Sequence, residues 1–153
     1  LIDVPKDVTD LKNKCEYMPM KPIPIGRAKK GITEEAVKEA IKLIAKAKKP
    51  VVFVGGGAVI AGAAKELKKF VDLVDAPVCD SLMGKGAFDG TNERYTGMIG
   101  MHGTKASNLG VSQCDLLIAL GARFSDRVIG NPKRFAEGAK VIHIDVDAAE
   151  MSV

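Results

Sequence analysis

The chain has 153 residues, 46% of them hydrophobic, which is enough for one domain with a buried core and too little for two. The formal net charge is +4 and its excess of Lys and Arg lies before Val51, but only 5% of the residues are aromatic, so nucleic-acid binding is not expected. No apolar run approaches the roughly 20 residues of a membrane span, and neither a membrane segment nor a targeting peptide is expected.

Residues 1–30 contain four prolines among mixed charges and show no sustained hydrophobic period. This composition indicates a strand remnant of a preceding domain followed by an extended linker. Residues 31–153 are expected to form one domain that is cut short at its C-terminus. Its first helix should begin at Thr33, a favourable N-cap, and end near Lys49, with an inward stripe of Val37, Ala40, Ile41 and Ile44.

A buried strand is expected at residues 51–54, where continuous apolar residues follow a proline. This strand runs into Gly55, Gly56 and Gly57, and the three glycines predict a sharp turn into a second helix. The second helix should end at Asp75 and should bury Ile60, Ala64, Leu67, Val71 and Val74.

Three more buried strands are predicted, at residues 76–80, 115–120 and 140–147. Between them lie a turn-rich stretch at 88–95, a helix at 104–111 and a short helical piece at 132–135. Continuous apolar strands that alternate with helices indicate an α/β domain. We expect a doubly wound, mostly parallel sheet between two helix layers, which is a Rossmann-like three-layer fold.

The predicted strands end in residues that a ligand site would use: Gly55, Gly56 and Gly57; Asp80 and Ser81; Gly121, Ala122 and Arg123; and Asp145. The carboxyl ends of parallel strands share one edge of a sheet, where ligands bind in this fold class. Glycines admit a pyrophosphate, an arginine supplies forked donors, and Asp145 or Asp80 could accept hydrogen bonds from ribose. However, Ile60 breaks the G-x-G-x-x-G/A fingerprint, so tight packing explains the glycine loop almost as well.

Other polar residues leave alternatives open. His102 lies among glycines and is predicted to contact a ligand, whereas His143 alternates within a strand and is predicted to be structural. Asp126 and Arg127 could be functional or could pair with each other on the surface. Three scattered cysteines without a C-x-x-C pair indicate a reducing compartment, here the cytoplasm, and give no basis for a metal site. No nucleophile and base form a set, so the residues alone indicate a binding domain.

Five segments in the same order carry a resemblance to a known family: residues 48–57, 82–88, 97–103, 121–128 and 142–147. Together they resemble the central domain of the acetolactate synthase (acetohydroxyacid synthase) catalytic subunit, a thiamine-diphosphate enzyme. Residues 1–7 resemble the last strand of the pyrimidine-binding domain that precedes it in that family.

The resemblance implies that the sheet holds FAD, which in this family serves structure because joining two 2-ketoacids involves no net redox change. It places Gly55, Gly56 and Gly57 on the FAD phosphates and ribitol, and Met101 and His102 beside the flavin. It places Gly121, Ala122 and Arg123 on the pyrophosphate and adenosine, Asp145 at the adenosine end, and Arg27 over the cofactor. Asp126 and Arg127 resemble a pair that lines the channel to thiamine diphosphate, although Ser125 stands where many members have aspartate.

The resemblance also implies what this chain lacks. The thiamine-activating glutamate and the Gly-Asp-Gly type motif for Mg²⁺ and diphosphate belong to the other domains of the polypeptide, so the fragment alone is expected to be inactive. The whole enzyme would condense pyruvate with pyruvate or 2-ketobutyrate in branched-chain amino-acid biosynthesis, as a homo-oligomer with a small regulatory subunit. Two alternatives remain: a scaffold domain with a vestigial nucleotide site, and the equivalent domain of a sister enzyme such as pyruvate oxidase.

Overall fold

A computed structural model describes residues 8, 32–132, 134–147 and 150 of the chain. The predicted strand remnant and linker, and with them Arg27, therefore lie outside the described residues, Val8 excepted. The described part forms one five-stranded sheet, with all neighbouring strands parallel and in the order β3-β2-β1-β4-β5. The strands are β1 (Pro50–Val54), β2 (Val78–Asp80), β3 (Tyr95–Met98), β4 (Leu116–Leu120) and β5 (Lys140–Ile144).

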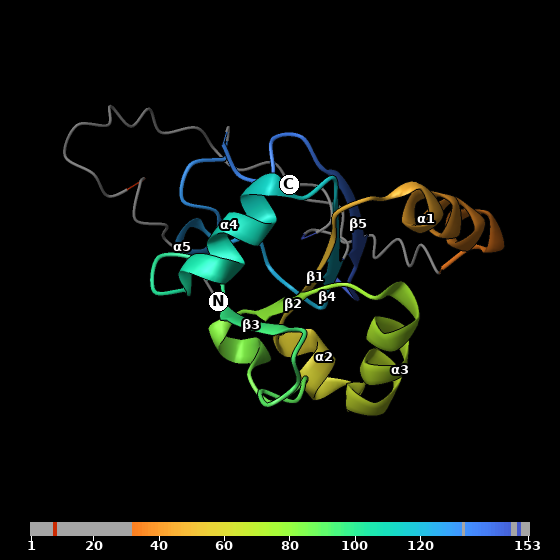
Figure 1. The fold of residues 1–153 in the computed structure, drawn as a ribbon, viewed down its shortest axis with the longest axis horizontal. Coiled ribbons are helices and arrows are strands. Elements are labelled where there is room, and N and C mark those ends of the chain that lie inside the picture. The colour runs from red at the N-terminus through yellow and green to blue at the C-terminus, as the bar shows by residue number, and fades with distance from the viewer. Residues whose placement is uncertain (1–7, 9–31, 133, 148–149, 151–153) are drawn as a thin grey trace, which may run out of the picture.

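Helices cover both faces of the sheet (Figure 1). They are α1 (Glu34–Lys46), α2 (Gly56–Ile60), α3 (Ala64–Val74), α4 (Lys105–Gln113), α5 (Asp126–Ile129) and the 3₁₀ helix η1 (Leu82–Gly84). Residues of α1 and α3 pack on the core cluster that contains Val52 and Val54. Residues of α4 and of the segment 124–139 pack on the cluster that contains Val51 and Phe53. The structure thus confirms the three-layer α/β fold.

Strand β1 explains why the sheet is buried on both sides. Successive side chains of a strand point to opposite faces, and the four residues from Val51 to Val54 are each at most 6% exposed. A strand that is apolar at every position therefore needs cover on both faces, which the helices supply.

The predicted second helix is wrong in one respect. The structure divides it into α2 and α3, and Gly62 in the connection has a φ of +63°. Leu67 and Val71 are buried as predicted, but Ile60 is 90% exposed and Ala64 is exposed too. The break at Gly62 interrupts the helical period, so Ile60 does not share the inward face of α3.

Four further predictions differ from the structure. The buried strand expected at 140–147 is β5, which ends at Ile144, and Lys140, Val141 and Ile144 are exposed. Strand β3 was missed because it is a short edge strand interrupted by Gly97 at a φ of +101°, within a stretch rich in turn residues. The short helical piece lies at Asp126–Ile129 rather than at 132–135, since Ser125 and Asp126 provide the N-terminal residues that a helix prefers. In α1, Val37 and Ile41 remain exposed, while Leu43, Ile44 and Ala47 make the packing contacts.

Candidate functional site

The strand order creates one switch point in the sheet. The chain moves from β1 outward to β2 and β3, and then returns to place β4 on the other side of β1. Val54 and Leu120, the last residues of β1 and β4, are direct partners in the ladder. The loops that follow these two strands therefore leave the sheet side by side, which is where open α/β sheets bind their ligands.

At this switch point, Gly55 and Gly57 lie against Gly121. A Cβ atom on Gly55 would overlap the Gly121 carbonyl oxygen, and one on Gly57 would lie 2.8 Å from the Gly121 Cα. Gly121 has a φ of +56°, a region that favours glycine. Close contact between the two loops therefore requires glycine at all three positions.

The loop N–H groups are partly committed to this packing. Gly55 N–H donates to the Leu120 carbonyl oxygen at 3.0 Å, and Gly57 N–H donates to the Gly121 carbonyl oxygen at 2.9 Å. Within the described residues, the Gly56 N–H makes no hydrogen bond. The packing explanation therefore accounts for Gly55 and Gly57, and Gly56 is the residue of the three whose N–H stays available to a ligand.

On the other side of the glycine loop lies η1. A Cβ atom on Gly56 would be 3.0 Å from the Cβ of Met83, so the two residues are in contact. Leu82 is 70% exposed and Met83 is 74% exposed. The sequence leaves Met83 open between a gap-filling role and contact with a flat apolar ring system. It does not single out Leu82, although two large apolar side chains directly after a strand end were a usable signal.

The predicted flavin-bordering and channel-lining residues form one group. Met101 N–H donates to the Arg127 carbonyl oxygen at 2.9 Å, which places Met101 and His102 next to Asp126 and Arg127. All four residues are exposed. Because β2 and β1 separate β3 from β4, the segment after β4 spans three strand positions, or about 14 Å, to reach this loop.

Asp126 and Arg127 do not pair with each other in the way that the surface alternative requires. The Asp126 carboxylate accepts a hydrogen bond from the Arg127 backbone N–H at 2.9 Å, as a first-turn residue of α5. Among the described residues, the Arg127 guanidinium makes no ion pair. The Arg127 side chain is exposed to solvent instead.

The next two predicted residues, Arg123 and Asp145, lie after the strands β4 and β5. The Arg123 Nε lies 2.7 Å from Glu150 Oε1, with the arginine side chain 77% exposed. His143 Nε2 lies 2.9 Å from the Ala122 carbonyl oxygen and 3.9 Å from Asp145 Oδ2, so it ties the Ala122 loop to the end of β5. His143 is therefore structural, as predicted, while sequence reasoning missed Glu150.

Asp80 does not serve the role that was considered for it. It is 3% exposed, and its carboxylate accepts hydrogen bonds from the Tyr95 hydroxyl at 2.8 Å and the Lys85 ammonium at 3.5 Å. Burial is the main cause that holds the pKa of Tyr95 above its ordinary value, and the Asp80 carboxylate raises it further. The hydrogen bond with Tyr95 is the main cause that raises the pKa of Lys85. Asp80 is thus engaged within the protein and does not face a ribose.

Comparison with known proteins decides the family. The sequence model described as "Thiamine pyrophosphate enzyme, central domain" matches residues 37–153. The chain belongs to this family. It is 46% identical over 159 residues to a protein named probable acetolactate synthase large subunit from Methanocaldococcus jannaschii, with 98% of this chain and 26% of that protein covered. The chain is also 46% identical to the acetolactate synthase large subunit of Porphyra purpurea and 43% identical to the acetolactate synthase of Arthrospira platensis, with 99% of this chain covered in both.

These relatives confirm the resemblance, and they also show its limit. The chain spans about a quarter of the length of the curated relatives that it matches, 26% of the first and 27% of the last. The segment that the chain matches is therefore one part of those longer proteins.

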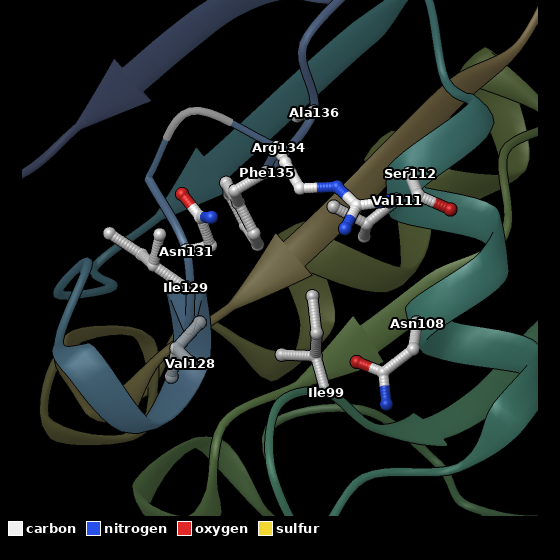
Figure 2. A pocket seen from close by; sticks show the side chains of 10 residues that line it. All are labelled: Ile99, Asn108, Val111, Ser112, Val128, Ile129, Asn131, Arg134, Phe135 and Ala136. Carbon is white, nitrogen blue, oxygen red and sulfur yellow. The ribbon is translucent and has the colours of Figure 1, made fainter.

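Two cavities lie elsewhere on the central domain. One, of about 290 Å³, is bounded by α4, Ile99 and residues 128–136 (Figure 2), and the other, of about 320 Å³, by α3 and residues 86–92. None of the described candidate site residues lines either of them.

Three observations on the described part of the chain concern metal ligands, thiols and membrane spans. It contains no group of His, Cys, Asp and Glu side chains that could hold a metal ion. Burial raises the pKa of Cys79 to about 12 and that of Cys114 to about 11, so both thiols stay protonated and unreactive. None of the described helices is long and apolar enough to pass through a membrane.

Proposed function

We propose that the chain is the FAD-binding central domain of an acetolactate synthase large subunit. The observation that carries this proposal is the sequence identity of 46% over nearly the whole chain to proteins of that name. The whole protein would condense pyruvate with pyruvate or 2-ketobutyrate, with loss of carbon dioxide, in branched-chain amino-acid biosynthesis.

The residues at the switch point fit FAD in type and arrangement. An extended dinucleotide needs an anion site, hydrogen-bond acceptors for ribose hydroxyls and an apolar surface for a flat ring system. The Gly56 N–H and the Arg123 guanidinium would hold the pyrophosphate, and the Asp145 carboxylate would accept from the adenosine ribose. Gly55, Gly57, Gly121 and Ala122 bring the backbone of both loops to the same edge.

The flavin end would lie toward β3. Met101 is 74% exposed and Met83 is 74% exposed, and methionine side chains adapt well to an aromatic ring. His102 would border the ring, and Arg127 with Asp126 would face the channel toward thiamine diphosphate. Arg27 completes the proposed set from the linker. Because the condensation has no net redox change, the bound flavin would supply structure rather than electrons.

The remaining proposals concern the whole enzyme. Thiamine diphosphate and Mg²⁺ would bind to the other domains of the polypeptide, so the chain of 153 residues would not catalyse the reaction alone. A homo-oligomer, a small regulatory subunit and a cytoplasmic location follow from the same assignment. Formation of acetolactate by the isolated chain would contradict the non-catalytic role.

One observation favours the scaffold alternative. Two of the three glycine N–H groups donate to carbonyl oxygens of the β4 end rather than pointing to open space. A domain that only joined its neighbours would need this packing and would need no nucleotide. The flavin titration below separates the two readings, and flavin reduction during turnover would instead indicate a pyruvate oxidase type of enzyme.

The test is an FAD titration of the natural-length protein, in which quenching of the flavin fluorescence reports binding. Arg123→Gln should weaken binding about tenfold, because a charge-assisted contact to phosphate is lost. Arg134→Gln is the matched control, since Arg134 is also exposed but lies on the 290 Å³ cavity, and it should leave the affinity unchanged. No quenching at saturating FAD would support the scaffold.

A further inference from the structure

Asn108 on α4 makes an unusual double contact with the loop after β3. Its side-chain carbonyl oxygen accepts from the Gly100 N–H at 3.0 Å, and its amide nitrogen donates to the Gly100 carbonyl oxygen at 3.0 Å. One side chain therefore satisfies both backbone groups of a single residue. No other residue type of this length offers a donor and an acceptor at once.

The clamped residue sits where three elements meet. Gly100 has a φ of +100°, and a Cβ atom on it would overlap the Arg127 carbonyl oxygen. That same oxygen accepts from the N–H of Met101, the next residue. Any shift of Gly100 would therefore move Met101 and His102 relative to α5.

The cavity beside Asn108 makes this contact more important. Figure 2 shows Asn108 and Val128 on opposite sides of the 290 Å³ cavity, with Ile99 between them. Side-chain packing is therefore incomplete between this part of α4 and α5. The hydrogen bonds at Gly100 and Met101 therefore add a polar connection between the two helices near the candidate site.

We propose that Asn108 is a positioning residue, which sets where Met101 and His102 lie relative to Asp126 and Arg127. Its effect on the flavin rests on the proposed function, whereas its effect on the loop does not. Asn108 acts through the Gly100 backbone, so its loss should alter the loop and leave the rest of the domain folded.

The first arm of the experiment measures amide hydrogen exchange by NMR in the 153-residue chain and needs no flavin. Asn108→Ala should speed exchange of the Gly100 amide about tenfold, the factor that one lost hydrogen bond corresponds to. Asn108→Asp keeps an acceptor for the Gly100 N–H, so that amide should stay protected. Ser112→Ala is the matched control, because Ser112 lines the same cavity but its hydroxyl donates to the Leu109 carbonyl oxygen within α4.

The second arm measures the FAD dissociation constant and the visible circular dichroism of bound flavin in the natural-length protein. Asn108→Ala should raise the dissociation constant about three- to tenfold and change the flavin spectrum. Asp115→Asn weakens a similar double contact at the far edge of the sheet, so it should lower stability without changing either flavin signal.

The outcomes separate the two hypotheses. Unchanged exchange at Gly100 and Met101 in Asn108→Ala would overturn the proposal, as would equal flavin changes in Asp115→Asn. If the wild-type protein binds no FAD, the proposed function fails, while the exchange data still decide whether Asn108 positions the loop. If Asn108→Ala does not fold, Asn108→Asp carries the test: it loses the bond to the Gly100 carbonyl, and faster exchange at Met101 but not at Gly100 is expected.

Discussion

The two edges of the sheet are built in opposite ways. At the amino edge, the Asp115 carboxylate accepts from the N–H groups of Lys48 and Lys49 at 2.7 and 2.9 Å, and Lys140 N–H donates to the Asp115 carbonyl oxygen at 3.0 Å. At the carboxyl edge, glycines hold the loops together, and Leu82, Met83 and Met101 remain mostly exposed. The amino edge is satisfied within the chain, whereas the carboxyl edge leaves surface for other groups.

This difference indicates that the amino edge contributes to folding stability and that the carboxyl edge is the binding surface. An edge whose polar groups are paired internally contributes to folding and needs no partner. An edge with an uncommitted N–H at Gly56 and exposed apolar side chains gains from a ligand or a neighbouring domain. The glycines belong to both descriptions, because they close the loops tightly and still leave one donor free.

Replacement of Gly55 by alanine is the strongest way to break the carboxyl edge. The new Cβ would overlap the Gly121 carbonyl oxygen and lie close to the Ala122 Cα, and backbone cannot yield as a side chain can. We expect a loss of at least about 3 kcal/mol in the free energy of unfolding, measured by urea titration. In the control Gly138→Ala, the Cβ meets no atom within 4 Å, and stability should hardly change. A small effect at Gly55 would mean that the loops are not in close contact.

Tyr95→Phe tests the part of the carboxyl edge that is paired. The substitution removes the hydroxyl that donates to the carboxylate of Asp80, a residue only 3% exposed. The Asp80 carboxylate then keeps only the longer of these two hydrogen bonds, from Lys85. We expect a loss of about 1.5–3 kcal/mol in thermal or urea unfolding, because a buried charged acceptor loses a donor. Replacing Asp80 by Asn in the same background should reduce the loss. Unchanged stability would show that water replaces the hydroxyl and that Asp80 is accessible after all.

The sequence predicts the strands of the sheet better than the contacts between the loops that follow them. Residues 51–54 and 116–120 are continuously apolar, and this pattern is enough to predict buried parallel strands and the edge on which their ends meet. It also predicts that Gly121 and Ala122 lie on the same edge as the glycine loop. The contact that makes Gly55 and Gly57 necessary is between residues about 65 positions apart, and a local pattern does not contain it.

Three features escape sequence reasoning for specific reasons. Strand β3 contains Gly97 at a positive φ, which contradicts the usual strand signal. Ile60 belongs to a helical period that Gly62 interrupts, so periodicity predicts burial where the residue is 90% exposed. Asn108 has no motif, because its role depends on a backbone that folds back to it from eight residues earlier.

Asp115→Asn sharpens the description of the amino edge through its pH dependence. Hydrogen bonds from Lys48 N–H and Lys49 N–H lower the pKa of Asp115 from 3.8, so the unfolded chain binds its proton more readily than the folded one. The stabilisation is therefore complete above pH 3.8 and is lost as the pH falls through the folded pKa. The variant should be less stable than wild type at pH 7, and the difference between their urea midpoints should shrink toward pH 2. A gap that stays constant would show that the charge does not contribute.

Gly110→Ala gives the smallest effect and the opposite sign. Gly110 lies inside α4, its φ is not positive, and a Cβ atom on it meets nothing within 4 Å. Alanine lowers the conformational entropy of the unfolded chain and is less costly than glycine inside a helix. The free energy of unfolding should therefore rise by about 0.5–1 kcal/mol. The thermal midpoint of the variant measures this gain. If alanine destabilises both Gly55 and Gly110, the chain's glycines share a general requirement for flexibility; opposite signs would confine the requirement to the glycines that close the carboxyl edge.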